Sequence, residues 1–168
     1  NGDLFCAMQG KWDKRADKNS LRPEHRGSNY FDLLVDTAAK FYQPYGSHFA
    51  VLGRGNHETA VTGRHETDLT DRLASRMRAH GSNVEASGYG GFVIFRFCDA
   101  AQKGDARAIK DSKTLYHFHG TGGGGPVTRG TIQTNRIAVW CPDADIVLTG
   151  HTHDEWSVTI PRMRCSKM

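Results

Sequence analysis

The sequence predicts an α/β fold, because two kinds of segment follow one another along the chain. Short apolar runs of strand length end at glycines, and the clearest is residues 49–52, which precede Gly55. Other segments carry apolar residues at helical spacing, as Leu69, Leu73 and Met77 do. In open α/β sheets, ligands bind in the loops beyond the carboxyl ends of the strands. The loop that begins at Gly55 is therefore the first place to look for function.

Three helices and several strands are expected. A helix over residues 30–43 should end at Pro44, a second should run from Leu69 to about Gly81, and a short one should cover residues 131–139. Strands are expected at residues 49–52, 83–86, 91–97, 115–119, 146–148 and 156–160, and the chain opens on what resembles the end of a further strand. The polar stretches 10–27 and 99–113 are expected to be loops.

Length and composition favour one globular domain without a membrane span. The 168 residues are enough for one domain with a real core, and the hydrophobic fraction of 38% is that of a globular protein. The longest apolar runs are four or five residues, whereas a membrane helix needs about 20. No signal peptide is visible, which favours a cytoplasmic location.

The cysteines and the net charge exclude little beyond zinc ribbons and thioredoxin-like folds. The four cysteines are scattered and contain no CxxC pair, as expected in a reduced compartment. They are Cys6, Cys98, Cys141 and Cys165. The net charge of +4 and the pI of about 9.0 permit an anionic substrate, such as a phosphate ester or a nucleic acid, but require neither.

Four expected strand ends each carry a glycine beside side chains that bind metals. These are Gly2-Asp3, Gly55-Asn56-His57-Glu58, His119-Gly120 and Gly150-His151-Thr152-His153. Their carboxylate, amide and imidazole groups suit first-row divalent metals. In an extended backbone, His151 and His153 would project to one side with Cα atoms roughly 6–7 Å apart. Two such rings could bind neighbouring metals roughly 3.5–4 Å apart. His117 and His119 alternate in the same way, so either could face the site, and His119 is favoured.

These four motifs, in this order, resemble those of the calcineurin-like metallophosphoesterases, and the resemblance covers nearly the whole chain. It implies a two-layer β-sandwich flanked by helices, formed as a single domain over residues 1–168. It also implies two metal ions (Mn, Fe or Zn) at the strand ends. Asp3 would bridge the metals, Asn56, His119 and His151 would complete one site, and His153 would serve the other.

The resemblance also implies a reaction, the hydrolysis of a phosphoester. A hydroxide activated by the dinuclear site would attack phosphorus, while His57 protonates the leaving group. Arg54 could add positive charge beside the phosphate or be a surface arginine. Two departures are visible: the family's Asp-x-His strand is not in the chain, so a truncated domain is expected, and Cys6 replaces the second carboxylate of the Gly-Asp-x-x-Asp motif. In relatives that carboxylate can orient the catalytic histidine.

The sequence leaves the substrate open between a phosphomonoester, a phosphodiester and a nucleic acid. A nuclease acting on DNA or RNA would bind its substrate in a salt-sensitive manner through Lys14, Arg15 and Lys18. A different alternative is a catalytically silent structural or interaction module that binds metal, since Cys6 interrupts the orienting motif. Metal content without turnover would favour that alternative. The sequence makes no prediction about the oligomeric state.

Overall fold

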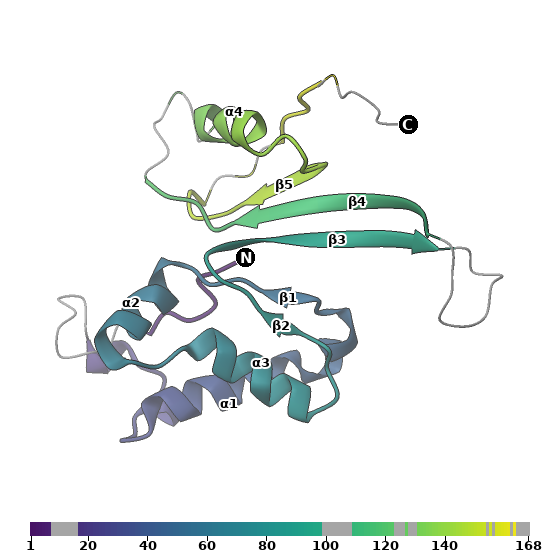
Figure 1. Cartoon of the computed structure of the whole chain (residues 1–168). Coiled ribbons are helices and arrows are strands. Elements are labelled where there is room, and N and C mark those ends of the chain that lie inside the picture. Colours follow the sequence, from purple (N-terminus) through teal and green to yellow (C-terminus); the bar gives the residue numbers. More distant parts are fainter. Residues whose placement is uncertain are drawn as a thin grey trace. The chain divides into compact units, whose positions relative to one another are not determined.

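The computed structural model describes residues 1–7, 17–98, 109–122, 127, 131–153, 155, 157–161 and 163, without the side chain of Lys18. The contacts divide the chain into two compact units. The first is Asn1–Gly91 with His117–His119, and the second is Phe92–Tyr116 with Gly120–Met168. Within the described ranges the structure is mixed α/β, with four α-helices and two small sheets (Figure 1). The α/β class predicted from the sequence is confirmed.

The first unit is built around a short parallel strand pair. Its elements are η1 (Lys18–Ser20), η2 (Pro23–His25), α1 (Tyr30–Tyr42), η3 (Gln43–His48), β1 (Val51–Leu52), α2 (Asn56–His65), α3 (Leu69–Ala79) and β2 (Glu85–Ala86), where η denotes a 3-10 helix. Strands β1 and β2 pair in parallel. Because parallel neighbours need a crossover connection, the chain passes through α2 and α3 between them. The end of β1 therefore leads directly into α2.

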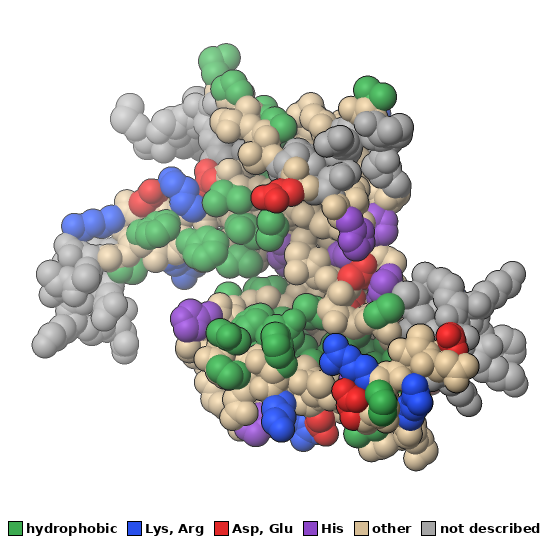
Figure 2. All heavy atoms as spheres, turned by 180° about the vertical axis from the view of Figure 1, so that it is seen from behind, with side chains coloured by type: hydrophobic (Ala, Val, Ile, Leu, Met, Phe, Trp, Pro, Cys, Tyr) green, Lys and Arg blue, Asp and Glu red, His purple; other side chains and the backbone are tan. Residues whose placement is uncertain are grey.

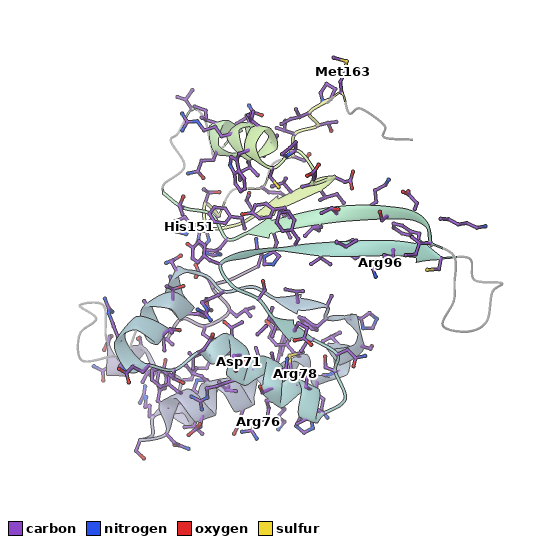
Figure 3. The ribbon with its side chains drawn as sticks, viewed as in Figure 1. Asp71, Arg76, Arg78, Arg96, His151 and Met163 are labelled. Carbon is purple, nitrogen blue, oxygen red and sulfur yellow. The ribbon has the colours of Figure 1, made fainter. Side chains whose placement is uncertain are left out.

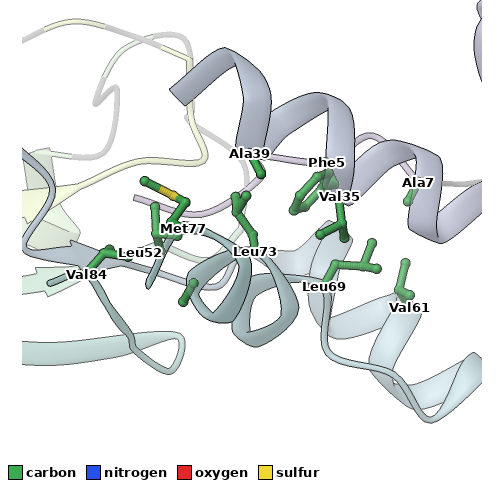
Figure 4. Close-up of a cluster of buried hydrophobic side chains, with 11 residues drawn as sticks. Phe5, Ala7, Val35, Ala39, Leu52, Val61, Leu69, Leu73, Met77 and Val84 are labelled. Carbon is green, nitrogen blue, oxygen red and sulfur yellow. The ribbon is translucent and has the colours of Figure 1, made fainter. Parts of the chain in front are cut away.

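One hydrophobic core holds α1 and α3 together and reaches β1, α2 and the N-terminal segment (Figure 4). Leu69, Leu73 and Met77, the predicted apolar face of α3, are all buried. On the exposed side of the same helix pair, Arg76 of α3, which Figure 3 labels, forms an ion pair of 2.6 Å with Asp36 of α1. The remaining members of the core are Phe5, Ala7, Val35, Ala39, Leu52, Val61, Ala74 and Val84.

Asp68 caps the N-terminus of α3, and replacing it should lower the stability of the first unit. Its Oδ1 accepts hydrogen bonds from the backbone N–H groups of Thr70 at 2.9 Å and Asp71 at 3.2 Å. Asp68→Ala should therefore lower the free energy of unfolding by about 0.5–2 kcal/mol in urea titrations. Asp68→Asn keeps the accepting oxygen and should lose less. Equal losses would instead assign the effect to the ion pair that Asp68 forms with Arg54.

The second unit contains most of a three-stranded sheet and one helix. Strands β3 (Gly90–Cys98), β4 (Ile109–Phe118) and β5 (Ile146–Thr149) lie in the order β3-β4-β5, and α4 spans Thr131–Trp140. The ring of Trp140 on α4 packs edge-on against Tyr116 of β4, with centroids 5.4 Å apart. Hydrophobic side chains remain exposed on β3 and β4 and gather there in Figure 2.

Most elements lie where the sequence predicts them. Helices α1, α3 and α4 confirm the three expected helices, and β1, β2, β3 and β5 lie within or nearly within their expected ranges. The strand expected at 115–119 is also present as the second half of β4, which ends at Phe118. Part of the predicted loop 10–27 forms η1 and η2. Residues 8–16 lie outside the described residues.

Four expectations about helices, strands and loops were wrong. The stretch that follows Gly55 is not a loop, because α2 begins at Asn56, and the polar stretch expected to be a loop to residue 113 enters β4 at Ile109. Residues 157–160 form no strand, and neither do residues 1–7. Strand β4 begins in exposed and mostly polar residues. Their pairing with β3 fixes their conformation, whereas hydrophobic periodicity in a sequence indicates only burial.

Candidate metal centre

Two glycines let the N-terminal segment pass against the loop between β1 and α2. A Cβ atom at Gly55 would lie 2.2 Å from Oδ1 of Asp3 and 2.3 Å from its backbone nitrogen. Gly2 has a φ of +76°, and a Cβ there would lie 2.4 Å from Nδ1 of His119. Both positions therefore require a residue without a side chain. This close approach brings Asp3 to the N-terminus of α2.

Asp3 is held at the N-terminus of α2 in a strained backbone conformation. Its φ of 52° lies in the left-handed region, which is uncommon outside glycine and is found at functional sites. Its Oδ1 accepts a hydrogen bond of 3.0 Å from the backbone N–H of His57, in the first turn of α2. That helix terminus carries partial positive charge and stabilises a carboxylate. Oδ2 remains directed at the two imidazole rings of His57 and His119.

His119 presents one ring nitrogen to two oxygen atoms. Nδ1 lies 2.8 Å from the backbone carbonyl oxygen of Asn1, so Nδ1 carries a hydrogen and donates it. In the neutral ring Nε2 then bears a lone pair, yet it lies 3.1 Å from both Oδ2 of Asp3 and Oδ1 of Asn56. Electron-rich atoms at such distances repel one another unless a proton or a metal cation lies among them. The ring is only 2% exposed, so water screens this repulsion poorly.

The hydrogen bond at Nδ1 is typical of metal-binding histidines. Such rings usually donate their second N–H to a backbone carbonyl or a carboxylate, which orients the ring and fixes its tautomer. The backbone of His119 is also held, because its N–H donates to the carbonyl of Tyr89 at 2.9 Å. The Tyr89 ring packs edge-on against the imidazole, with centroids 5.3 Å apart. Burial, and secondarily the Asp3 carboxylate, raises the pKa of Tyr89.

His57 occupies a different position from His119. It lies in the first turn of α2, and its Nε2 is 3.9 Å from Oδ2 of Asp3. The side chain is 24% exposed, so the ring can exchange protons with solvent or with a bound molecule. The structure thus places two imidazoles beside one carboxylate: a buried one directed at oxygen ligands and a more accessible one.

His117 is directed at other groups. It is buried, and its Nε2 lies 3.0 Å from the hydroxyl of Ser87. A Cβ atom at Gly91 would lie 2.9 Å from the same nitrogen. Burial lowers the pKa of His117, which favours the neutral ring. Of the two alternating histidines, the structure places His119 and not His117 against Asp3.

His151 and His153 belong to the second unit and follow β5 (Figure 3 labels His151). Their φ angles of 74° and 56° are left-handed, so the expectation of an extended backbone at these two residues was wrong. His151 is half-buried and His153 is exposed. A Cβ atom at Gly120 would lie 2.8 Å from the carbonyl oxygen of Gly150 and 3.1 Å from Cβ of His151. His151 therefore lies against the residue that directly follows His119.

Three further residues in or beside the motifs are Arg54, Cys6 and Glu58. Arg54 forms an ion pair with Asp68, so much of its charge is already neutralised. Cys6 is exposed and a free thiol. Glu58, which was not among the predicted site residues, is fully buried and bonds to the backbone of Asp3. Its spacing of three residues from Gly55 is that of a capping box and could have indicated the bond to Gly55.

Comparisons of the chain with protein-family models, with curated proteins and with solved structures found no match. In the part of the chain that the structure describes, no helix has the length and apolar character needed to cross a membrane. The function of the chain is therefore inferred from the chemistry of the side chains in the first unit. A carboxylate and a buried imidazole with a fixed tautomer, joined by an amide oxygen, could hold a metal ion.

Proposed function

We propose that this chain is a metal-dependent phosphoesterase of the calcineurin-like type. The observation that carries the proposal is the convergence on Nε2 of His119, where Asp3 and Asn56 both present oxygen atoms at 3.1 Å. The hydrogen bond from Nδ1 to the carbonyl of Asn1 leaves the Nε2 lone pair for a cation. These three side chains are among those that the family resemblance assigns to one metal site.

His151 and His153 would supply the remaining ligands. In the proposed site His151 would be a ligand together with Asp3, Asn56 and His119, and His153 would help to hold a second ion. Nitrogen and oxygen ligands of this kind accept Mn, Fe and Zn, so the donor set does not select among these metals.

The chemistry divides between the metal ligands and His57. Bound metal ions would supply positive charge to the phosphate oxygens and make bound water more acidic. His57 would hold a proton at Nε2 and donate it to the departing oxygen. When it carries that proton, the ring forms an ion pair with Oδ2 of Asp3, 3.9 Å away. Asp3 would thus keep the charged ring beside the substrate, in the absence of the carboxylate that Cys6 replaces.

The proposal includes the calcineurin-like β-sandwich as the fold and a phosphoester as the substrate. A monoester, a diester and a nucleic acid remain alternatives within it. Of the cations expected to bind DNA or RNA, Lys14, Arg15 and the Lys18 side chain lie outside the described residues. The catalytically silent metal-binding module is supported by the exposed Cys6 thiol in place of the orienting carboxylate.

A pair of histidine variants in β4 and directly after it tests the metal site. His119→Ala should lower the bound Mn, Fe or Zn measured by elemental analysis, and with it the hydrolysis of nitrophenyl phosphate and bis(nitrophenyl) phosphate. His117→Ala removes another buried ring, two positions away, that is directed at Ser87, so it should keep the metal. Chelation should abolish hydrolysis by the wild type, and added metal should restore it.

Three outcomes would count against the proposal in different ways. Equal metal content in His119→Ala and the wild type would contradict the ligand assignment. An equal loss of metal in both variants would indicate a general effect of destabilising this part of the chain. Stoichiometric metal without turnover on monoesters, diesters or DNA would favour the silent module.

A further inference from the structure

Glu58 is a fully buried carboxylate with three backbone hydrogen bonds. Its Oε2 accepts from the N–H of Asp3 at 2.9 Å and from the N–H of Gly55 at 2.8 Å. Its Oε1 accepts from the N–H of Phe5 at 2.8 Å. Removing a carboxylate from water is costly, and it is tolerated where several donors stabilise the charge. Three N–H groups aimed at one carboxylate provide this stabilisation.

Capping of α2 explains only one of these bonds. The bond to Gly55 satisfies the N-cap residue of α2, as in half of a capping box. The other two bonds are made outside the helix. Asp3 precedes Glu58 by 55 positions in the chain, and Phe5 precedes it by 53. These bonds attach the N-terminal segment to the first turn of α2. Phe5 itself is a member of the hydrophobic core, so the attachment joins the core to the candidate site.

This attachment holds Asp3, the residue whose carboxylate faces His119 in the candidate site. Asp3 has a left-handed backbone, which costs free energy and persists only when its surroundings hold it. Glu58 holds its N–H, while the first turn of α2 holds Oδ1 through the N–H of His57. With backbone and carboxylate both anchored to one helix turn, Oδ2 keeps its position 3.1 Å from Nε2 of His119.

We propose that Glu58 is a positioning residue of the metal centre, which sets the place of the Asp3 carboxylate without touching the metal. This inference rests on the proposed function, because it assigns Glu58 a role in metal affinity. Partners that orient metal ligands typically change metal affinity by about 10–100-fold when they are mutated. A residue that only stabilised the fold would have no such specific effect.

Glu58→Gln tests the inference with little change of shape. The amide has one accepting oxygen and one donating nitrogen, so an N–H group must then face the backbone N–H of Phe5 or those of Asp3 and Gly55. We expect Mn²⁺ affinity, measured by calorimetric titration, to fall by about 10–100-fold. Val61→Ala is the matched control, since Val61 is a buried residue of the same helix that contributes to the core and lies outside the site. It should lower stability while leaving Mn²⁺ affinity nearly unchanged.

Amide hydrogen exchange gives a second measurement that does not depend on metal. In Glu58→Gln the amides of Asp3 and Phe5 should exchange faster, whereas the amide of Thr59, bonded within α2 at 3.0 Å to the carbonyl of Gly55, should stay protected. If Glu58→Gln does not fold, Glu58→Asp keeps the charge on a shorter side chain, and the same two measurements apply to it.

The possible results separate this inference from the proposed function. Wild-type protein that binds no Mn²⁺ would overturn both. Wild-type protein that binds Mn²⁺, with Glu58→Gln and Val61→Ala equally weakened or equally unaffected, would overturn the positioning role alone. Faster exchange at Thr59 together with Asp3 and Phe5 would show that α2 has unfolded, and Glu58 would then be structural only.

Discussion

Replacement of His57 by alanine is expected to lower turnover by roughly 10²–10⁴-fold while leaving the metal content unchanged. The ring is 24% exposed and lies 3.9 Å from Asp3, whereas the buried His119 ring is the one directed at both oxygen ligands. Loss of His57 should therefore remove a proton donor and leave the metal ligands in place. Steady-state kinetics and elemental analysis of the same preparation measure the two effects separately.

The leaving group identifies which step His57 assists. An alkyl phosphate needs a proton on its departing oxygen, whereas nitrophenolate departs without one, so His57→Ala should slow the alkyl substrate more. His65→Ala is a suitable control, because His65 ends the same helix and packs edge-on against Phe31. Equal losses on both substrates would argue against leaving-group protonation. A loss of metal would make His57 a ligand instead.

Periodic burial explains which elements the sequence could predict. In α3, Leu69, Leu73 and Met77 repeat at helical spacing and all three are buried, so the helix could be recognised from their positions. Helix α2 buries only Glu58 and Val61, which form no apolar stripe. Its first turn is held by hydrogen bonds to residues far away in the chain. Such bonds cannot be recognised from a local sequence pattern.

The candidate site was predictable in composition and only partly in geometry. Residue types and chain order indicated that Asp3, Asn56 and His119 would meet, and the first unit brings them together. The tautomer of His119 depends on a carbonyl 118 positions away, which no spacing rule reveals. The left-handed backbones of His151 and His153 could not be predicted either, because non-glycine residues seldom adopt that conformation.

Gly55→Ala should destabilise the first unit and weaken its metal binding together. The added Cβ would lie 2.2 Å from Oδ1 of Asp3 and 2.3 Å from its backbone nitrogen, closer than real contacts allow. Asp3 cannot yield easily, since Glu58 and His57 hold its backbone and carboxylate. Forcing extra volume into such packing costs about 1–3 kcal/mol, and occasionally more. Urea unfolding in the absence of metal and titration with Mn²⁺ measure the two losses.

Gly63→Ala is the opposite change in the same helix. Gly63 lies within α2, and a Cβ there would have no neighbour within 4 Å. Because glycine inside a helix costs conformational entropy, this variant should gain about 0.5–1 kcal/mol of unfolding free energy and keep its Mn²⁺ affinity. Two Gly→Ala variants of α2 would thus change stability in opposite directions, and only the one that meets Asp3 would affect the metal. If Gly55→Ala were as stable as Gly63→Ala, the N-terminal segment would not lie against the α2 terminus, and Asp3 could not be the ligand that joins this helix to His119.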